Sequence, residues 1–372
     1  MPATPPRDAR GHRALSRRWY TSRDVFDLEM ERIFLGRWLY AGRSSDLDAP
    51  GRCLGHDVGS ESAIVVRDSD FGLRAFHNQC RHRGTRLCDA GLTDVGRAIR
   101  CPYHAWTYSL RGELIGAPNM ADVTGFSRSE WPLHPVAVAE WEGCVMLNFA
   151  EAPVPFAEEF APLLGKFGPW RLDELRPVHE IGYDVGANWK LVFQNYSECY
   201  HCPTLHPHLD RLTPYRGAAN DLEEGPFLGG PMELTRPDGS MTMSGARCAP
   251  PLSDLTDARA DLVYYYTVLP NLLLSLHPDY VMIHRLEPQD VDRTRVVCQW
   301  LFHPDAAAAP GFDPSDAIEF WNVTNLQDWE VSERSQRGIS SRRYVPGPYS
   351  NLESMIAAWD REYLRIMNGD DA

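Results

Sequence analysis

Two short cysteine–histidine blocks are the feature that most constrains what this chain can fold into. They are Cys80-Arg-His82 and, further along the chain, Cys101-Pro-Tyr-His104, so that each block offers one sulfur and one imidazole. Two loops of this kind can divide their ligands between two iron atoms, with both sulfurs on one iron and both imidazoles on the other. That arrangement is the ligand set of a Rieske [2Fe–2S] centre. The pattern therefore predicts a protein that moves single electrons.

A structural zinc site is the main alternative for these four residues. Zinc ligands usually occur as Cys-x2-Cys followed by His-x3-5-His, with like ligands paired in sequence. Here cysteine and histidine alternate. In addition, Gly84 after the first block and Pro102 inside the second suit tight turns that present ligands. The pattern favours the iron–sulfur cluster over zinc.

Length and composition indicate a globular protein with more than one domain. The chain has 372 residues, of which 43% are hydrophobic and 24% charged, and about 150 residues per domain suggests two or three domains. The net charge of −14 argues against nucleic acid as a partner, because phosphate contacts require Lys and Arg. No apolar run approaches the roughly 18 residues of a membrane span, so we expect no membrane partner.

The first 20 residues are rich in arginine and contain no hydrophobic stretch after Arg17-Arg18. This composition does not suggest a secretory signal, and a disordered tail is expected, with an organelle transit peptide as the alternative. Nine cysteines in such a chain indicate a reducing compartment, where thiols serve as ligands or core residues. We therefore predict a cytoplasmic protein.

The pattern along the chain divides it into four parts. These are a disordered tail over 1–18, a helix within 19–37 that is expected to pack on the larger domain, a small β-rich domain over 38–150, and that larger domain over 156–372. Thr21 is expected to cap the first helix, and Gly36 to end or interrupt it. In the β-rich domain, turn residues separate five predicted strands: Trp38–Ala41, Ser62–Val66, Leu73–Phe76, Trp106–Tyr108 and Cys144–Phe149.

The larger domain mixes strands and helices. Residues 262–288 predict two strands joined at Pro270-Asn271, and residues 295–302 predict a third. A helix is expected to start at Asp313-Pro314 and to stop at Gly338. Ser350 and Glu353 form the pattern of a capping box before a last helix that ends near Met367.

The larger domain also contains a second possible metal site, because an electron carrier alone would need no second domain of this size. His201 and His206 could reach one metal if a helix ends before Pro203, with His201 on its last turn and His206 on the returning loop. Two histidines and one carboxylate hold the iron of non-haem Fe(II) oxygenases and leave positions open for O2. Asp328, on the helix that starts at Asp313, is the best candidate for the carboxylate.

Neighbouring residues offer competing interpretations. Trp321, Asn325, Asp328 and Ser332 follow helical spacing along one side and form a mildly polar stripe, whereas Glu330 and Glu333 are expected on the solvated face. Cys199 and Cys202 have the spacing of a redox dithiol or of half a zinc site. With no second cysteine pair nearby, they are interpreted as small packing residues.

With both constellations present, the chain resembles the α subunit of the Rieske non-haem iron oxygenases from about Trp19 to the last helix. The resemblance implies an α+β fold, in which a β-rich Rieske domain stands beside a helix-grip catalytic domain with a curved antiparallel sheet. It also implies a head-to-tail homo-oligomer, commonly a trimer. Its motifs fall on Cys80, His82, Cys101 and His104 as cluster ligands, and on His201, His206 and Asp328 as iron ligands.

The same resemblance implies roles for residues near the iron. Asn188-Trp-Lys190 opens the catalytic helix, and Asn195 and Glu198 are further candidate catalytic residues. Glu198 falls on the acidic position that links the cluster of one subunit to the iron of its neighbour. Hydrogen bonds from the two metal sites to such a residue would fix imidazole orientation.

The local sequence around Glu198 is similar to the branch that oxidises quaternary ammonium compounds such as carnitine and betaines. A trimethylammonium group suits an aromatic cage, for which the available residues are Tyr200, Tyr264, Tyr265, Tyr266 and Trp321. The resemblance implies a terminal oxygenase with one [2Fe–2S] cluster and one Fe(II) per chain. It would use O2 and electrons from NAD(P)H, delivered by a separate flavin or iron–sulfur reductase, to hydroxylate or N-demethylate a small molecule.

Two alternatives remain open at this point. One is a ring-hydroxylating oxygenase of an aromatic or alicyclic substrate. The other is a Rieske electron-transfer protein whose second domain lacks catalytic iron.

Overall fold

The computed structural model describes residues 12–252, 255 and 257–369. Contacts between Cα atoms divide the chain into two compact units, a small unit of residues 34–159 and a large unit formed by residues 1–33 and 160–372. Each unit is described by itself below. Among the described residues, no helix has both the length and the apolar character needed to cross a membrane.

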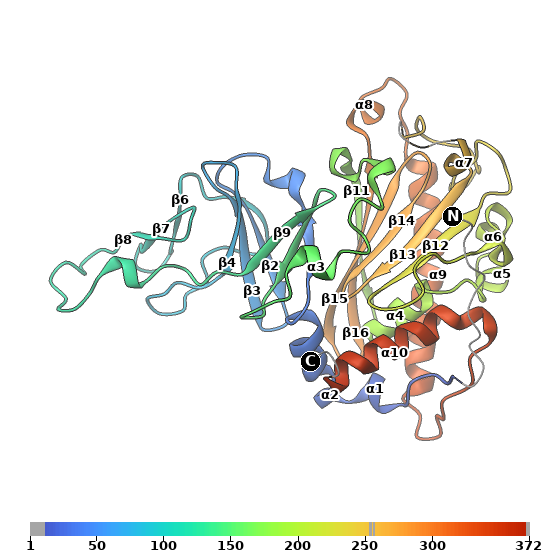
Figure 1. Ribbon diagram of the computed structural model, residues 1–372, viewed down its shortest axis with the longest axis horizontal. Helices are drawn as coiled ribbons and strands as arrows, with labels where there is room; N and C mark the ends of the chain where they lie inside the picture. Colours follow the sequence, from blue (N-terminus) through green and yellow to red (C-terminus); the bar gives the residue numbers. More distant parts are fainter. Residues whose placement is uncertain (1–11, 253–254, 256, 370–372) are drawn as a thin grey trace. The chain divides into compact units, whose positions relative to one another are not determined.

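The small unit is built from short antiparallel strands in three sheets (Figure 1). The strand orders are β1-β10-β9, β4-β3-β2-β5 and β6-β7-β8. The strands are β1 Leu39–Arg43, β2 Arg52–Val58, β3 Glu61–Arg67, β4 Leu73–His77, β5 Gly91–Asp94, β6 Ala98–Arg100, β7 Thr107–Ser109, β8 Leu114–Gly116, β9 Ala137–Trp141 and β10 Cys144–Asn148, and one helical turn, α3 Phe156–Glu159, follows them.

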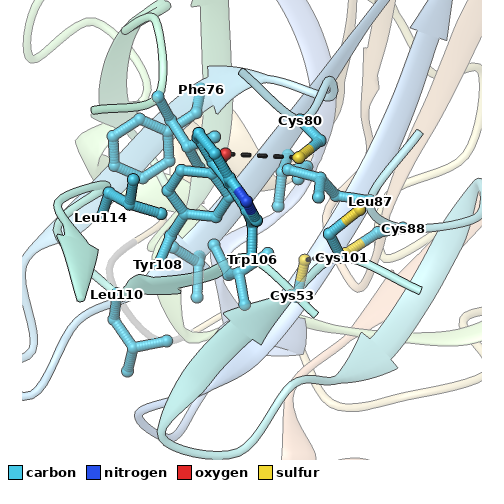
Figure 2. Packing of buried hydrophobic residues seen from close by; sticks show 14 residues of the cluster. Cys53, Phe76, Cys80, Leu87, Cys88, Cys101, Trp106, Tyr108, Leu110 and Leu114 are labelled. Carbon is cyan, nitrogen blue, oxygen red and sulfur yellow. Dashed lines mark hydrogen bonds between the residues drawn. The ribbon is translucent and has the colours of Figure 1, made fainter. Parts of the chain in front are cut away.

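A buried apolar cluster fills the small unit between the strands and the two cysteine–histidine loops (Figure 2). Phe76, Trp106 and Tyr108 pack in it beside Cys80 and Cys101. Burial of these large side chains is the main source of stability for the loops, because each aromatic ring removes extensive apolar surface from water.

The large unit contains one six-stranded antiparallel sheet in the order β11-β16-β15-β14-β13-β12. Its strands are β11 Arg176–Val185, β12 Phe227–Glu233, β13 Leu262–Val268, β14 Leu272–Leu276, β15 Val281–Asp290 and β16 Arg293–Phe302. Gly230, Tyr265 and Ser275 stand directly opposite one another on β12, β13 and β14, so they share one face of the sheet.

The three long helices of the large unit, α4 Trp189–Tyr196, α9 Ser315–Ile339 and α10 Ser354–Asn368, pack on that face. The shorter helices are α1 Arg18–Thr21, α2 Arg23–Glu29, α5 Cys202–Leu205, α6 Pro207–Leu212, α7 Asp257–Ala260 and α8 Pro304–Ala307 (Figure 1). The Tyr196 and Ser275 hydroxyls lie 2.8 Å apart and join α4 to β14. Tyr183 of β11 donates to Asn322 of α9 at 2.9 Å. The predicted combination of an antiparallel sheet and a long helix is confirmed.

A buried polar cluster anchors the start of α4. Asn188 caps the helix by accepting from the Lys190 amide at 3.1 Å. The Lys190 ammonium and the Trp189 indole then donate to the two oxygens of Glu29 in α2, at 2.5 and 2.8 Å, and the Tyr363 hydroxyl of α10 also donates to Glu29. Lys190 and Glu29 are fully buried, so this ion pair fixes α4 against α2 and α10.

Several sequence predictions for the large unit need correction. Thr21 ends α1 instead of capping a helix, and Ser22 precedes α2. Part of the predicted 1–18 tail, residues 1–11, lies outside the described residues. In residues 12–18, Arg13 forms an isolated β-bridge with Pro348, and the Leu15 side chain is buried. The structured chain therefore begins before Trp19.

Element boundaries also differ from the predictions. Residues 262–288 form three strands instead of two, because the chain turns again after Leu276. Helix α9 runs past Gly338 to Ile339. The capping box of Ser350 and Glu353 is confirmed, and Asp313 accepts from the Ser315 amide at the start of α9. The five predicted strands of the small unit are present within two residues, whereas β2, β5, β6, β8 and β9 were not predicted.

Candidate active site and metal centres

The two cysteine–histidine blocks form similar tight turns. In the first, the Gly84 amide donates to the Cys80 carbonyl at 2.9 Å, and in the second, the Ala105 amide donates to the Cys101 carbonyl at 3.2 Å. Each turn ends on a left-handed residue, with φ of 71° at Gly84 and 58° at Ala105. The first turn follows β4 and the second lies between β6 and β7, so the β framework holds both.

Sulfur and nitrogen atoms are separated by depth in these turns. Cys80 and Cys101 are buried in the apolar cluster, whereas His82 and His104 are exposed. The two imidazole rings lie 4.8 Å apart, and His82 stacks on Trp106. Partial desolvation and the neighbouring His104 lower the pKa of His82, which favours the neutral ring that a metal requires. The arrangement offers buried thiols and outward-facing imidazoles, as a Rieske cluster does.

The Tyr108 hydroxyl lies beside the Cys80 sulfur and contacts the first block (Figure 2). It lies 3.4 Å from the Cys80 sulfur and accepts a hydrogen bond from the Arg81 amide at 3.0 Å. Since the amide is the donor in the second contact, the phenolic proton is free to point at the sulfur. Hydrogen bonds to ligand sulfurs tune an iron–sulfur cluster. No local sequence pattern indicates this contact.

The second constellation brings together residues from three elements. His201 precedes α5, His206 lies between α5 and α6, and Asp328 is in the middle of α9. The Asp328 carboxylate lies 2.8 Å from His206 Nε2 and 3.5 Å from His201 Nε2. One ligand atom from each residue lies within 4.8 Å of the others, a spacing that could hold a metal ion.

The local structure around the histidines differs from the prediction. Helix α4 ends at Tyr196, so His201 is not on its last turn. Pro203 lies in the first turn of a helix instead of ending one, because its fixed φ and missing N–H suit the first turn of α5. His206 then stands at the junction of two short helices, where Pro207 begins α6.

Both histidines are oriented through their second ring nitrogen. His201 Nδ1 lies 2.6 Å from Glu198 Oε1, and His206 Nδ1 lies 2.7 Å from Gln327 Oε1. Such contacts fix the tautomer and leave Nε2 for a metal. Gln327 was not singled out from the sequence, although it adjoins Asp328. Glu198 also accepts from the backbone amides of Tyr200 and His201, so its carboxylate is held locally.

The electrostatics around His201, His206 and Asp328 favour a bound cation. Burial lowers the pKa of His201, but hydrogen bonds to Asp328 and Glu198 outweigh it and raise the pKa to about 10. Burial of Asp328 is likewise outweighed by hydrogen bonds to His201 and His206, which lower its pKa. A metal ion bound at Nε2 would supply the positive charge that a proton otherwise provides.

The competing acids of α9 lie elsewhere. Glu330 is exposed and pairs with Arg334, and Glu333 accepts from the Gly186 amide at 3.0 Å. Of the predicted stripe, Trp321 and Asp328 line a cavity, whereas Asn325 lies 3.1 Å from His284.

Cys199 and Cys202 form a disulfide, so their interpretation as free packing residues is wrong. Both line the cavity and they enclose Tyr200 and His201. The bridge constrains the short segment that presents His201. The Cys-x2-Cys spacing allows the two residues to form this disulfide without a second cysteine pair nearby.

A cavity of about 130 Å³ adjoins the three candidate metal ligands. Asn195 and Glu198 line it, together with the aromatic side chains of Tyr196, Tyr265 and Trp321. None of the described residues that line it is Lys or Arg. Of the five predicted cage aromatics, only Tyr265 and Trp321 are there.

The other three predicted cage residues lie away from the cavity. Tyr264 and Tyr266 point to the opposite face of the sheet because alternate residues of β13 point in opposite directions, and Tyr200 is 53% exposed. Tyr196, which the prediction missed, takes a place in the cavity wall from the end of α4.

Comparison with known proteins decides the family. Residues 37–127 match the Rieske [2Fe–2S] domain, and residues 172–369 match the catalytic domain of the ring-hydroxylating α subunit. The glycine betaine monooxygenase oxygenase subunit of Chromohalobacter salexigens is 32% identical over 92% of this chain and 83% of its own length. The chain belongs to the Rieske oxygenase α-subunit family.

Further similarities agree with this family. The carnitine monooxygenase oxygenase subunit of Acinetobacter baumannii is 28% identical over 88% of this chain and 85% of its own. A solved quaternary ammonium Rieske monooxygenase has the same fold, with a TM-score of 0.83, 24% identity and 95% of each chain covered. Naphthalene 1,2-dioxygenase from Rhodococcus also shares the fold, with a TM-score of 0.77, 19% identity, and 96% of this chain and 95% of its own covered.

Membership confirms the predicted class of protein and its cofactors. This Rieske oxygenase subunit is an oxidoreductase with a Rieske [2Fe–2S] domain and a catalytic domain of the type that binds mononuclear iron. It takes electrons from a reductase partner and acts on a small molecule. The alternative of an electron carrier without catalytic iron is thereby set aside.

Proposed function

We propose that this Rieske oxygenase hydroxylates a carbon next to nitrogen in a small quaternary ammonium compound. The observation that carries the proposal is the cavity beside His201, His206 and Asp328. Aromatic faces of Tyr196, Tyr265 and Trp321 line it, and its acidic side chains are Glu198 and Asp328, with no Lys or Arg among the described residues. Aromatic faces attract a cation that has no proton to donate. The relatives that act on glycine betaine and carnitine support the same class.

We assign the metal ligands from the chemistry of the donor sets. Cys80 and Cys101 would hold one iron of the cluster, and His82 and His104 the other. His201, His206 and Asp328 would hold the mononuclear iron, since two imidazoles and one carboxylate leave positions open. When bound, the cluster supplies single electrons and the ferrous ion supplies the capacity to activate O2. The 4.8 Å convergence of the second group supports its fit to one ion.

The surrounding residues then have defined tasks. Glu198 and Gln327 hold the Nδ1 atoms of the two histidines and so fix the ring planes. The aromatic walls hold the ammonium group and exclude water. Substrate, O2, two electrons and two protons yield the hydroxylated substrate and water. When the hydroxylated carbon is an N-methyl group, the C–N bond breaks and releases formaldehyde, a proton and the demethylated amine.

We also propose a domain division and a quaternary arrangement. The Rieske domain would span 38–150 and the catalytic domain 156–372, with the helix in 19–37 packing on the catalytic domain. The compact units 34–159 and 1–33 with 160–372 support this division. A head-to-tail trimer, closed by a heterologous interface, would bring one chain's cluster beside the next chain's Glu198. Sedimentation of the purified protein measures the assembly directly.

A substrate panel tests the proposed function. The holoenzyme with a surrogate NADH-dependent reductase is given glycine betaine, carnitine, choline and small aromatic acids, and formaldehyde and product masses are measured. We expect oxidation of at least one quaternary ammonium compound. Oxidation of aromatic compounds alone would contradict the proposal and support the ring-hydroxylating alternative.

A variant tests the bridging role of Glu198. Glu198→Gln is expected to keep both metals but to lose or uncouple turnover, because the amide cannot accept equally from two imidazoles. Glu330→Gln, on the solvated side of α9, is the matched control and should keep full activity. Full activity of Glu198→Gln would refute the bridging role.

A further inference from the structure

One wall of the cavity is a short backbone segment that lies along β12. Ala218, Ala219 and Asn220 face the cavity from this segment. The Ala219 amide donates to the Pro231 carbonyl at 3.0 Å, and the Asp221 amide donates to the Gly229 carbonyl at 3.0 Å. These bonds pair the segment with the exposed edge of the sheet, so the wall has a fixed backbone.

Gly230 of β12 makes this close approach possible, and the adjacent Gly229 makes a close approach to β13 possible. A Cβ atom on Gly230 would stand 2.3 Å from the Ala219 oxygen and 2.7 Å from the Asn220 Cα. Gly229 has φ of 140°, and a Cβ there would stand 2.0 Å from the Tyr265 oxygen. A side chain at Gly230 would push the wall away, whereas one at Gly229 would collide with the backbone of β13. Gly230 therefore lets Asn220 stand against the cavity.

Neighbouring side chains of the segment are held in different surroundings. Asp221 binds Lys166 Nζ at 2.7 Å and accepts from the Tyr266 hydroxyl at 3.1 Å, beside the sheet face that carries Tyr264 and Tyr266. Asn220 lines the cavity instead, and its amide has no hydrogen-bond partner within the described structure. Because Asp221 anchors the segment, the neighbouring Asn220 side-chain amide is held in place and is available to a ligand.

Several other uncharged polar groups of the cavity are already engaged, but the Tyr265 hydroxyl on the sheet face is buried without a hydrogen-bond partner among the described residues. The Tyr196 hydroxyl contacts Ser275, and the Ser197 and Thr324 hydroxyls donate to backbone carbonyls of their own helices. Asn195, in the last turn of α4 and three residues before Glu198, also lines the cavity and has no side-chain hydrogen-bond partner among the described residues. Asn220 is the free amide on the wall formed at the sheet edge.

We infer that Asn220 is a specificity-determining residue that hydrogen-bonds the oxygen-bearing end of the substrate. The inference rests on the proposed function, since a quaternary nitrogen held by the aromatic faces leaves the rest of the molecule to reach a polar wall. Because no Lys or Arg among the described residues lines the cavity, a carboxylate or hydroxyl of the substrate would meet a neutral amide instead of an ion-pair partner. The amide can donate to either group.

The test compares two ligands that differ only in this end. Dissociation constants are measured by calorimetry on the holoenzyme without reductase. One ligand is whichever of glycine betaine, carnitine or choline the wild type binds most tightly, and the other is tetramethylammonium. Asn220→Ala is expected to weaken the first about tenfold, as for one lost hydrogen bond, and to change tetramethylammonium less than about twofold. Asp221→Ala is the matched control, which loosens the wall and should affect both ligands alike.

The outcomes separate this inference from the proposed function. Equal weakening of both ligands in Asn220→Ala, or no weakening of either, would overturn the role of Asn220 while the wild type still binds and oxidises quaternary ammonium compounds. A wild type that neither binds nor oxidises any of them would overturn the proposed function and this inference together. If Asn220→Ala lowers kcat/KM for the oxygen-bearing ligand as well as its affinity, Asn220 acts on the productive complex.

Discussion

Removal of the Tyr108 hydroxyl is expected to lower the reduction potential of the Rieske cluster. The hydroxyl lies 3.4 Å from the Cys80 sulfur, and its own acceptor position is taken by the Arg81 amide. Once Cys80 binds iron as a thiolate it has no proton, so Tyr108 must be the donor. A donor stabilises the more negative, reduced cluster more than the oxidised one. Tyr108→Phe keeps the buried ring and removes only this contact.

The size of the change follows from one hydrogen bond. A net contribution of about 1 kcal/mol, with about 59 mV for each tenfold change in a one-electron equilibrium, corresponds to a potential lower by about 40 mV. Protein-film voltammetry of the purified protein measures it. The matched control is Tyr103→Phe, whose hydroxyl contacts Arg83 and not a sulfur, and which should shift the potential by less than about 10 mV. An unchanged or higher potential in Tyr108→Phe would refute the reasoning.

Three further predictions concern the fold around the site. Glu29→Gln removes the counter-charge of the fully buried Lys190 and should destabilise the protein by about 3–5 kcal/mol in denaturant titrations, and addition of Lys190→Met should recover part of this. Burial raises the pKa of Asp360 to about 7, above the ordinary value, so the folded state holds this proton more tightly. The stability it contributes is present below about pH 4 and lost as the pH rises towards 7, and Asp360→Asn should remove that decline from pH-dependent unfolding curves. Alkylation of the aerobically purified, denatured protein should label seven of the nine cysteines, and all nine only after reduction of the Cys199–Cys202 bridge.

The two cysteine–histidine blocks could be predicted from sequence because their chemistry is local. Each block carries its ligands and its turn residue within five positions, so no knowledge of distant contacts is needed. The helix that carries Asp328 was predictable for a similar reason, since the Asp313-Pro314 start and the polar stripe are local patterns. The boundaries differed where tertiary packing overrides a local signal, as when α9 continues through Gly338.

The residues that the sequence did not reveal depend on non-local arrangement. Whether Tyr264 or Tyr265 faces the cavity is decided by the register of β13 against its neighbours, which a run of three tyrosines cannot specify. Asn220 gains its place only because Gly230 lets a distant segment approach β12. Gln327 acts through the orientation of α9 towards His206, which follows from the packing of the whole helix.

The central claim is that one chain holds a two-iron cluster and a separate iron at His201, His206 and Asp328, and metal analysis tests it most directly. The anaerobically reconstituted wild type should contain about three irons per chain. Asp328→Ala should retain about two irons and the visible absorption of the cluster, and should lose oxygenase activity. An Asp328→Ala protein that still holds three irons, or a fully active wild type with only two, would contradict the account.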